Sequence, residues 1–110
     1  MKEQDLVNAI LDWLRSHGAW AIRVNSGSMP IEQANGSRRI FRGAPAGTPD
    51  ILACWPGGLM MGIECKMPGN KPTPLQAATL EAMQETGALT VVAYSVDDVE
   101  KAINERINQV

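Results

Sequence analysis

One apolar stretch, broken once by a tight turn, constrains the fold of this chain more than any other feature. Residues 51–55 and 59–63 are apolar apart from one glycine, and a Pro-Gly-Gly sequence at 56–58 separates them. Such a turn between two apolar runs predicts a β-hairpin. Asp50 precedes the first run, so pairing around the turn would place it opposite the end of the second strand.

The second strand of this hairpin is expected to continue to residue 66 and to end in charged residues. Glu64 and Lys66 lie two positions apart, so their side chains share one face of a strand and Cys65 faces the other way. Asp50, Glu64 and Lys66 would then meet at one edge of a buried sheet. A strand-end salt bridge, with Asp50 serving only a turn, explains the same pattern equally well.

A metal site is the functional interpretation of this group. Two carboxylates can bind a hard divalent cation, with water and a substrate phosphate filling its other positions. The backbone carbonyl of Cys65 would be a further ligand. Lys66 would orient or help to deprotonate the attacking water and offset charge on the phosphate.

The same residues resemble a known family. Pro49-Asp50 followed by Glu64-Cys65-Lys66 is similar to the motif of the PD-(D/E)XK nuclease superfamily, and the wider pattern resembles its VRR-NUC family, the virus-type replication-repair nucleases. The other landmarks are a glutamate near the start of an N-terminal helix, an Asn-Ser-Gly after the first strand and a glutamine that opens a later helix: Glu3, residues 25–27 and Gln76. The resemblance covers nearly the whole chain and implies one stand-alone nuclease domain over residues 1–110.

The resemblance implies an α/β fold of the restriction-endonuclease type, a mixed β-sheet flanked by helices in the order α-β-β-β-α-β-α. It also implies metal-dependent hydrolysis of DNA with Mg²⁺ or Mn²⁺. The implied catalytic residues are Asp50, Glu64, Lys66, Gln76 and Glu3, and the implied metal ligands are Asp50, Glu64 and the Cys65 carbonyl. On the residues alone, Glu3 is more simply a partner of the helix dipole, and Gln76 is a solvent-facing residue.

Apolar periodicity predicts the remaining elements. Helices are expected at 3–17, 74–86 and 96–108, and strands at 19–25, 38–42 and 88–94. Leu75, Ala78, Leu80, Ala82 and Met83 are expected to form the apolar face of the second helix. Thr73 is expected to cap that helix, and Ser95 with Asp98 has the spacing of a capping box before the third. The three tryptophans and the Met60-Met61 pair are expected in the core, with a subunit contact as the other place for the tryptophans.

The bulk composition excludes several classes of protein. The 110 residues suit a single domain, and no apolar stretch is long enough to cross a membrane. One histidine and two cysteines cannot build the usual tetrahedral zinc sites, and both cysteines are expected to be reduced. The net charge of −2 does not favour nucleic acid, but residues 1–72 hold eight Lys/Arg and six Asp/Glu, whereas 73–110 hold two and six.

Local charge, rather than net charge, attracts a polyanion. Arg38, Arg39 and Arg42 form a basic cluster before the Pro-Asp motif, suited to phosphate contact or simply solvated in a loop. The residues expected to contact nucleic acid are Arg23, Asn25, Arg38, Arg39, Arg42 and Lys71. Lys71 is equally well a solvated side chain, and Asn25 equally well fixes the loop that follows it.

The family resemblance implies a nuclease that acts on DNA, structure-directed (junction, flap or nicking), in phage or bacterial replication or repair. A homodimer or higher homo-oligomer in the cytoplasm of a bacterial or phage-infected cell is expected, with no membrane partner. The alternative is a non-catalytic nucleic-acid-binding or assembly module on the same fold, which predicts loss of an active-site residue. A small α/β domain with a chance motif is a third hypothesis, and it predicts neither metal affinity nor DNA binding.

Overall fold

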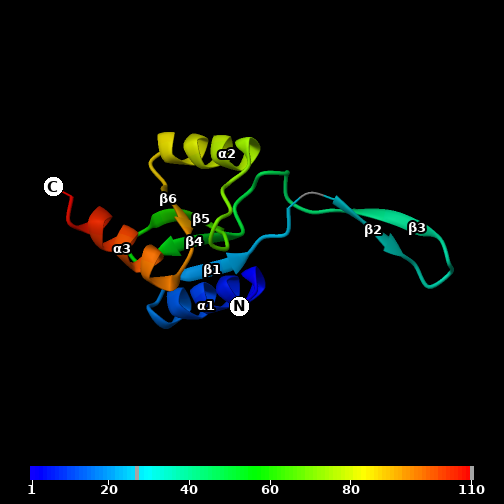
Figure 1. Ribbon diagram of the computed structural model, residues 1–110, viewed down its shortest axis with the longest axis horizontal. Helices are drawn as coiled ribbons and strands as arrows, with labels where there is room; N and C mark the ends of the chain where they lie inside the picture. The colour runs from blue at the N-terminus through cyan, green and yellow to red at the C-terminus, as the bar shows by residue number, and fades with distance from the viewer. Residues whose placement is uncertain (27, 110) are drawn as a thin grey trace.

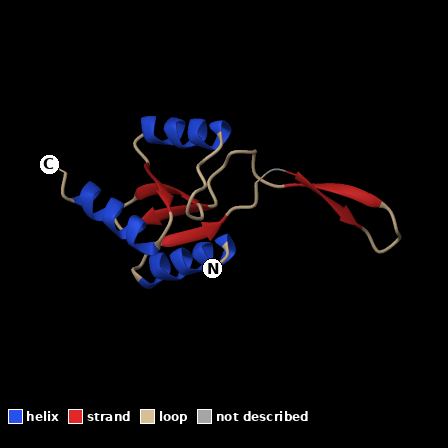
Figure 2. Ribbon diagram, in the orientation of Figure 1, coloured by secondary structure: helices blue, strands red, loops and turns tan. Residues whose placement is uncertain are grey.

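Three helices and six strands make up the computed structural model of the chain, which describes residues 1–26 and 28–109, with side chains except at 28–32 and 39–42. The elements in chain order are α1 (Glu3–Ser16), β1 (Trp20–Arg23), β2 (Ser28–Glu32), β3 (Arg38–Arg42), β4 (Ile51–Trp55), β5 (Leu59–Cys65), α2 (Pro74–Glu85), β6 (Leu89–Ala93) and α3 (Val96–Ile107). Figures 1 and 2 show a compact body from which the β2–β3 hairpin extends.

The body is built on a four-stranded mixed sheet in the order β1-β4-β5-β6. The hairpin predicted around residues 56–58 is confirmed, because β4 pairs antiparallel with β5 and Ile51 lies opposite Ile63. β6 adds to β5 in parallel, and α2 makes the crossover between them. The expected α/β fold with a mixed sheet and flanking helices is thereby confirmed.

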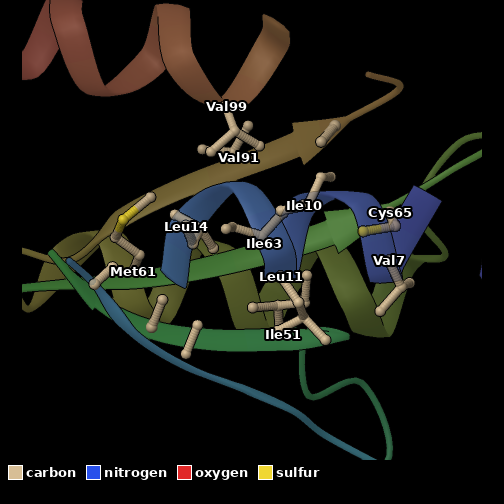
Figure 3. Close-up of a cluster of buried hydrophobic side chains, with 14 of the residues drawn as sticks. Val7, Ile10, Leu11, Leu14, Ile51, Met61, Ile63, Cys65, Val91 and Val99 are labelled. Atoms are coloured by element: carbon tan, nitrogen blue, oxygen red, sulfur yellow. The ribbon is translucent and has the colours of Figure 1, made fainter. Parts of the chain in front are cut away.

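One face of the sheet carries the hydrophobic core, under α1 and α3. Alternate residues of β4, β5 and β6 point to this face, among them Ile51, Ile63 and Val91, and they pack against Ile10 and Leu14 of α1 (Figure 3). The first helix has the expected apolar stripe at helical spacing. On α3, Val99 and Ile103 are buried as expected, whereas Ile107, expected on the same stripe, is 58% exposed. One continuous core therefore fixes β4 and β5 at both ends, at the hairpin turn and at the end that carries Asp50 and Glu64.

The opposite face is covered by α2, but with a different stripe from the one expected. Leu80 is the helix's buried residue, and Leu75 is 53% exposed. Ala78 and Ala82 are exposed as well, so that part of the expected apolar face is wrong. The positions that face inward are Gln76, Thr79, Leu80 and Met83, at i, i+3, i+4 and i+7. The first turn of α2 lies over the turn at Gly47 and over Glu64, so polar residues occupy the inner positions there.

α2 leaves the β1 end of this face open to solvent. Trp20 is 58% exposed, and Ile22 and Met60 are partly exposed beside it on paired strands. The expectation that Met60 lies in the core is therefore wrong, whereas Met61 is fully buried. Neither does Trp20 belong to the core.

The other two tryptophans pack against each other at the turn end of β4. The rings of Trp13 and Trp55 are stacked, with centroids 5.9 Å apart. The ring centroid of the exposed His17 lies 4.1 Å from that of Trp13. His17 is the C-cap residue of α1, as expected for a residue at the end of that helix.

The hairpin of β2 and β3 forms a separate two-stranded sheet. Its outward extension makes the molecule 57 Å long, against 31 and 28 Å in the other directions (Figure 1). The strand at 38–42 was expected, but β2 was not, because Pro30 interrupts its pattern; a two-stranded ribbon consists only of edge strands, where proline is tolerated. The ribbon's base is closed by Ala44, whose N–H donates to the Asn25 carbonyl at 2.8 Å.

No helix in the described ranges is long and apolar enough to span a membrane.

The capping of α3 follows the expected pattern only in part. The N–H of Asp98 donates to the Ser95 hydroxyl at 3.2 Å, but the Asp98 carboxylate accepts from the N–H of Tyr94, one residue earlier than in a capping box.

Gly47, in the turn before Pro49-Asp50, packs against α2, and its substitution should destabilise the fold. Gly47 has φ +91°, and a Cβ there would lie 2.8 Å from Leu75 Cγ. Gly69 has nearly the same φ, +88°, with nothing near its Cβ position. We expect Gly69→Ala to cost about 1 kcal/mol of unfolding free energy through backbone strain, and Gly47→Ala about 1–3 kcal/mol more through overpacking. Urea unfolding followed by tryptophan fluorescence measures both, and equal losses would contradict a close contact with α2.

Candidate active site

The register of the β4–β5 hairpin positions the first carboxylate of the site. Asp50 precedes Ile51, and the pairing of Ile51 with Ile63 brings Asp50 opposite Glu64. The N–H of Cys65 donates to Asp50 Oδ2 at 2.8 Å. On the other side, the Asp50 carbonyl accepts from the N–H of Val24, which follows β1. Asp50 is therefore fixed between two neighbouring strands.

Glu64 supplies the second carboxylate, and it is the buried charged residue of the described structure. Its side chain is 1% exposed. One oxygen, Oε1, accepts a hydrogen bond from Gln76 Nε2 at 3.4 Å. The other oxygen, Oε2, is buried without a hydrogen-bond partner among the described residues. A buried carboxylate oxygen of this kind is costly unless a cation or another donor binds it.

Burial and crowding of charge raise the pKa of Glu64 to about 8. Desolvation is the largest cause, followed by Asp50, which favours the protonated form of Glu64 as a hydrogen-bond acceptor and opposes the ionised form by its charge. The ammonium of Lys66 acts in the opposite direction, and the charge of Glu3 raises the pKa a little further. Asp50 is thus close enough to Glu64 to disfavour the ionised form of Glu64 in the absence of a cation.

The residue between the two charged positions points the other way, as expected from strand alternation. The Cys65 side chain is fully buried in the core beside Val7 (Figure 3). Burial, with the nearby charges of Asp50 and Glu64, raises the pKa of its thiol to about 12. The sulfur therefore stays protonated, and only the backbone carbonyl of Cys65 is available toward the site. Both cysteines are free thiols.

Gln76 reaches the site from the first turn of α2, on which Thr73 is the N-cap residue. Its Nε2 contacts Glu64, while its Oε1 accepts from the N–H of Thr73 at 2.9 Å. The expectation that Gln76 is merely solvent-facing does not hold. Thr73 was expected only as a cap; the Thr-x-x-Gln spacing of a capping box was the available signal that it also binds Gln76.

Glu3 lies in the first turn of α1 and is exposed. Its charge contributes to the raised pKa values of Glu64 and Cys65, so it lies within electrostatic range of the site. No group of three His, Cys, Asp or Glu side chains close enough to hold a metal ion is found among the described residues. Glu3 is therefore not brought into a three-carboxylate cluster with Asp50 and Glu64.

The donor set fits a hard divalent cation. Two carboxylates with one unbonded buried oxygen, together with a backbone carbonyl, offer oxygen ligands only. Mg²⁺ and Mn²⁺ bind such sites and complete their coordination with water and substrate phosphate. Asp50, Glu64 and the Cys65 carbonyl would hold the ion.

The basic residues lie at different distances from this centre. Arg23 is exposed at the end of β1 and lowers the pKa of Cys65 through its charge, so it lies beside the site. Lys71 is exposed in the loop before α2, and Arg38 is exposed on β3. The side chains of Arg39 and Arg42 lie outside the described residues. The backbone of Asn25 closes the base of the ribbon, which supports its loop-fixing role, and its side chain is exposed.

An open hollow elsewhere, on the outer face of α3, does not compete with this site. Its lining is mostly acidic and amide side chains, including Asp97, Glu100 and Glu105. It holds none of the residues of the Asp50–Glu64 centre.

Comparison with known proteins agrees with this geometry. The model of the VRR-NUC domain family matches residues 1–97. A solved VRR-NUC domain superposes with a TM-score of 0.65, covering 94% of this chain and 97% of the other at 23% identity, which shows the same fold. A provisionally named nuclease, p44 of Acyrthosiphon pisum secondary endosymbiont phage 1, is 39% identical over 51 residues, 46% of this chain.

That match spans about half, 55%, of the length of the phage protein. The family match, in contrast, covers most of this chain and includes Asp50, Glu64, Lys66 and Gln76. The chain therefore belongs to the VRR-NUC domain family of nucleases.

Proposed function

We propose that this protein is a Mg²⁺- or Mn²⁺-dependent nuclease that hydrolyses DNA phosphodiester bonds. The observation that carries the proposal is the pairing of Asp50 with the buried Glu64, whose Oε2 has no partner among the described residues. Lys66 directly follows β5, and its ammonium lies near enough to Glu64 to act against the rise in the pKa of that carboxyl. This arrangement offers oxygen ligands for a metal ion and a lysine ammonium, which are the groups that the proposed hydrolysis requires.

Each residue of the centre has a separate role in the proposal. Asp50, Glu64 and the Cys65 carbonyl hold the ion, which when bound polarises the scissile phosphate and lowers the pKa of a water. Lys66 orients the attacking water and offsets the charge that develops on the phosphate. Gln76 orients Glu64. Glu3, exposed and outside the immediate centre, acts at most as an accessory acid near it.

The substrate in this proposal is held by the β2–β3 ribbon and by the basic residues at its base. Arg23 at the end of β1 and Lys71 before α2 would contact phosphates near the cleaved bond, and Arg38, Arg39 and Arg42 phosphates further along the strand. A two-stranded ribbon has dimensions that fit a DNA groove. We infer from this extended arm that a branched or otherwise structured DNA is preferred, in replication or repair of a phage or its bacterial host.

Homo-oligomerisation belongs to the same proposal. The open apolar strip of Trp20, Ile22 and Met60 supports it, because exposed apolar patches of this kind mark interaction surfaces. A symmetric dimer would present two centres to a two-stranded or branched substrate. The cytoplasm of the bacterial cell is where such a substrate would be met, and the mass of the purified protein in solution decides the oligomeric state.

The alternative is a non-catalytic module that binds nucleic acid and uses the nuclease fold only for assembly. That hypothesis predicts that Asp50, Glu64 or Lys66 is missing or out of place. All three are present, with Asp50 and Glu64 in contact, which favours the enzyme.

Cleavage of a labelled DNA panel is the direct test. The panel would contain supercoiled plasmid, linear duplex, single strand, flap and four-way junction, each with Mg²⁺, Mn²⁺ or EDTA. We expect metal-dependent cutting by wild type that falls at least about 100-fold in Asp50→Asn and Lys66→Ala, because each removes a charge from the reacting centre.

Glu105→Gln on α3 is a matched control that removes a surface carboxylate away from the centre, and it should cut as wild type does. Tight binding of one DNA structure without cutting would support the non-catalytic module. A protein that neither cuts nor binds any DNA of the panel would contradict the proposed function, and only the fold would stand.

The raised pKa of Glu64 predicts how stability depends on pH in metal-free protein. The folded pKa is about 8, against an ordinary value of 4.5. Between these pH values the unfolded chain loses this proton while the folded protein keeps it, so the contribution of Glu64 to stability is largest below pH 4.5 and falls as pH rises toward 8. We expect Glu64→Gln to remove this slope and to exceed wild type in stability at pH 8.

Thermal unfolding of both proteins from pH 5 to 8.5, with EDTA and with Mn²⁺, measures the effect. The difference between the two proteins isolates Glu64 from other carboxylates. Mn²⁺ should stabilise wild type most at pH 8 and Glu64→Gln much less. A wild type whose stability runs parallel to that of Glu64→Gln across this range would contradict the buried, proton-binding Glu64.

The salt dependence of DNA binding tests the ribbon. With Ca²⁺ in place of the catalytic ion, Arg38→Ala, Arg39→Ala and Arg42→Ala should each weaken binding, and each lost phosphate contact should reduce the slope of log K against log salt by about 1. Lys101→Ala, on the acidic side of α3, is the control and should leave both unchanged. Unaltered slopes in all three arginine variants would remove the ribbon from the DNA interface.

A further inference from the structure

Hydrogen bonds link the N-cap of α2 to Gln76 and link Gln76 to Glu64. The N–H of Gln76 donates to the Thr73 hydroxyl at 3.2 Å, and the N–H of Thr73 donates back to Gln76 Oε1 at 2.9 Å. These two bonds make a capping box. The same Gln76 amide donates from Nε2 to Glu64 Oε1 at 3.4 Å. Gln76 is therefore bonded at both ends of its amide.

The capping box decides which end of the amide faces Glu64. A backbone N–H can only donate, and the Glu64 carboxylate that holds the proposed cation is ionised and can only accept. If the amide were rotated by half a turn, Nε2 would face the N–H of Thr73 and Oε1 would face the carboxylate, so both contacts would be repulsive. The cap thereby directs the donor to Glu64 Oε1 and leaves Oε2 as the unbonded oxygen.

Thr73 is itself attached to the body of the protein. The loop before it is held by Tyr94, whose hydroxyl donates to the Asn70 carbonyl at 2.8 Å, and the N–H of Asn70 donates to the Met67 carbonyl at 3.0 Å. Tyr94 directly follows β6, the strand beside β5. The cap thus has a fixed place relative to the strand that carries Glu64.

We propose that Thr73 is a positioning residue for the metal centre: through Gln76 it holds the Glu64 carboxylate in the rotation that presents Oε2 to the cation. Thr73 does not contact Glu64, and the inference rests on the proposed metal site. Residues that orient a ligand in this way typically change metal affinity by about 10- to 100-fold when they are removed.

The test compares two helix caps whose hydroxyl groups accept the same kind of hydrogen bond. Ser95 caps α3 with a hydroxyl that accepts from an N–H at 3.2 Å, as Thr73 does on α2. The affinity of the DNA-free protein for Mn²⁺ is measured by calorimetry, and the melting temperature by scanning, for wild type, Thr73→Ala, Thr73→Ser and Ser95→Ala. We expect similar falls in melting temperature for Thr73→Ala and Ser95→Ala, because each loses one N-cap.

Only Thr73→Ala should also weaken Mn²⁺ binding, by about 10-fold, and Thr73→Ser should restore it. In a Gln76→Ala background, Thr73→Ala should cause no further loss of affinity, because its effect passes through Gln76. The side-chain amide signal of Gln76 in an NMR spectrum of metal-free protein, assigned by its absence in Gln76→Ala, should move in Thr73→Ala and stay in place in Ser95→Ala.

The outcomes separate this inference from the proposed function. A wild type that binds Mn²⁺ beside a Thr73→Ala that melts lower but binds equally well overturns the positioning role alone. A further loss of affinity in the Gln76→Ala background overturns the route through Gln76. A wild type that binds no Mn²⁺ overturns the metal site, and the positioning role with it.

Discussion

The pairing register of one hairpin is the constraint on which the site depends. With Ile51 opposite Ile63, Asp50 must lie beside Glu64, and the amide of Cys65 donates to Asp50 Oδ2. Because side chains alternate along a strand, a shift of one residue would turn Glu64 into the core and Cys65 toward the site. The buried row beneath β4 and β5 resists such a shift, since it would remove Ile63 from the apolar core and place the Glu64 carboxylate there (Figure 3). Core packing and the two carboxylates are thus set by one register.

The two faces of the sheet have different tasks. The face under α1 and α3 supplies the core, whereas α2 covers only part of the other face and buries one large residue, Leu80. A helix with so little apolar burial must be placed by other contacts. Gly62, where a Cβ would lie 2.7 Å from Met83 Cε, allows close approach to the sheet, and the cap at Thr73 fixes the first turn. The close approach at Gly62 thus holds the end of α2 near Met83, and the polar contacts of the cap hold the first turn, which reaches Glu64. Such a polar first turn is suited to orienting a side chain.

Sequence periodicity predicted the hairpin and the core-facing Cys65 beside Glu64, because both follow from the two-residue repeat of a strand. The shared face of Glu64 and Lys66 stays a prediction, since β5 ends at Cys65. It did not predict β2, since Pro30 obscured a strand that has no neighbour but β3. It misplaced the inner stripe of α2, because the first turn of the helix lies over a turn and a carboxylate rather than over apolar residues. The contact of Gln76 with Glu64 depends on the approach of a helix to a strand, which no local pattern encodes, and only the family resemblance indicated it.

The energetics of Glu64 argue against a domain that has kept this fold for binding alone. A carboxylate that is 1% exposed, beside Asp50 and with one unbonded oxygen, costs folding free energy in the absence of a cation, on the order of 1–3 kcal/mol for an unsatisfied buried polar group. A glutamine or an apolar residue at this position would avoid the repulsion with Asp50. Strain of this kind concentrates at sites where a ligand relieves it. Binding to DNA phosphates through an arginine ribbon needs no such buried pair, so the pair supports the proposed cation site rather than a role in binding alone.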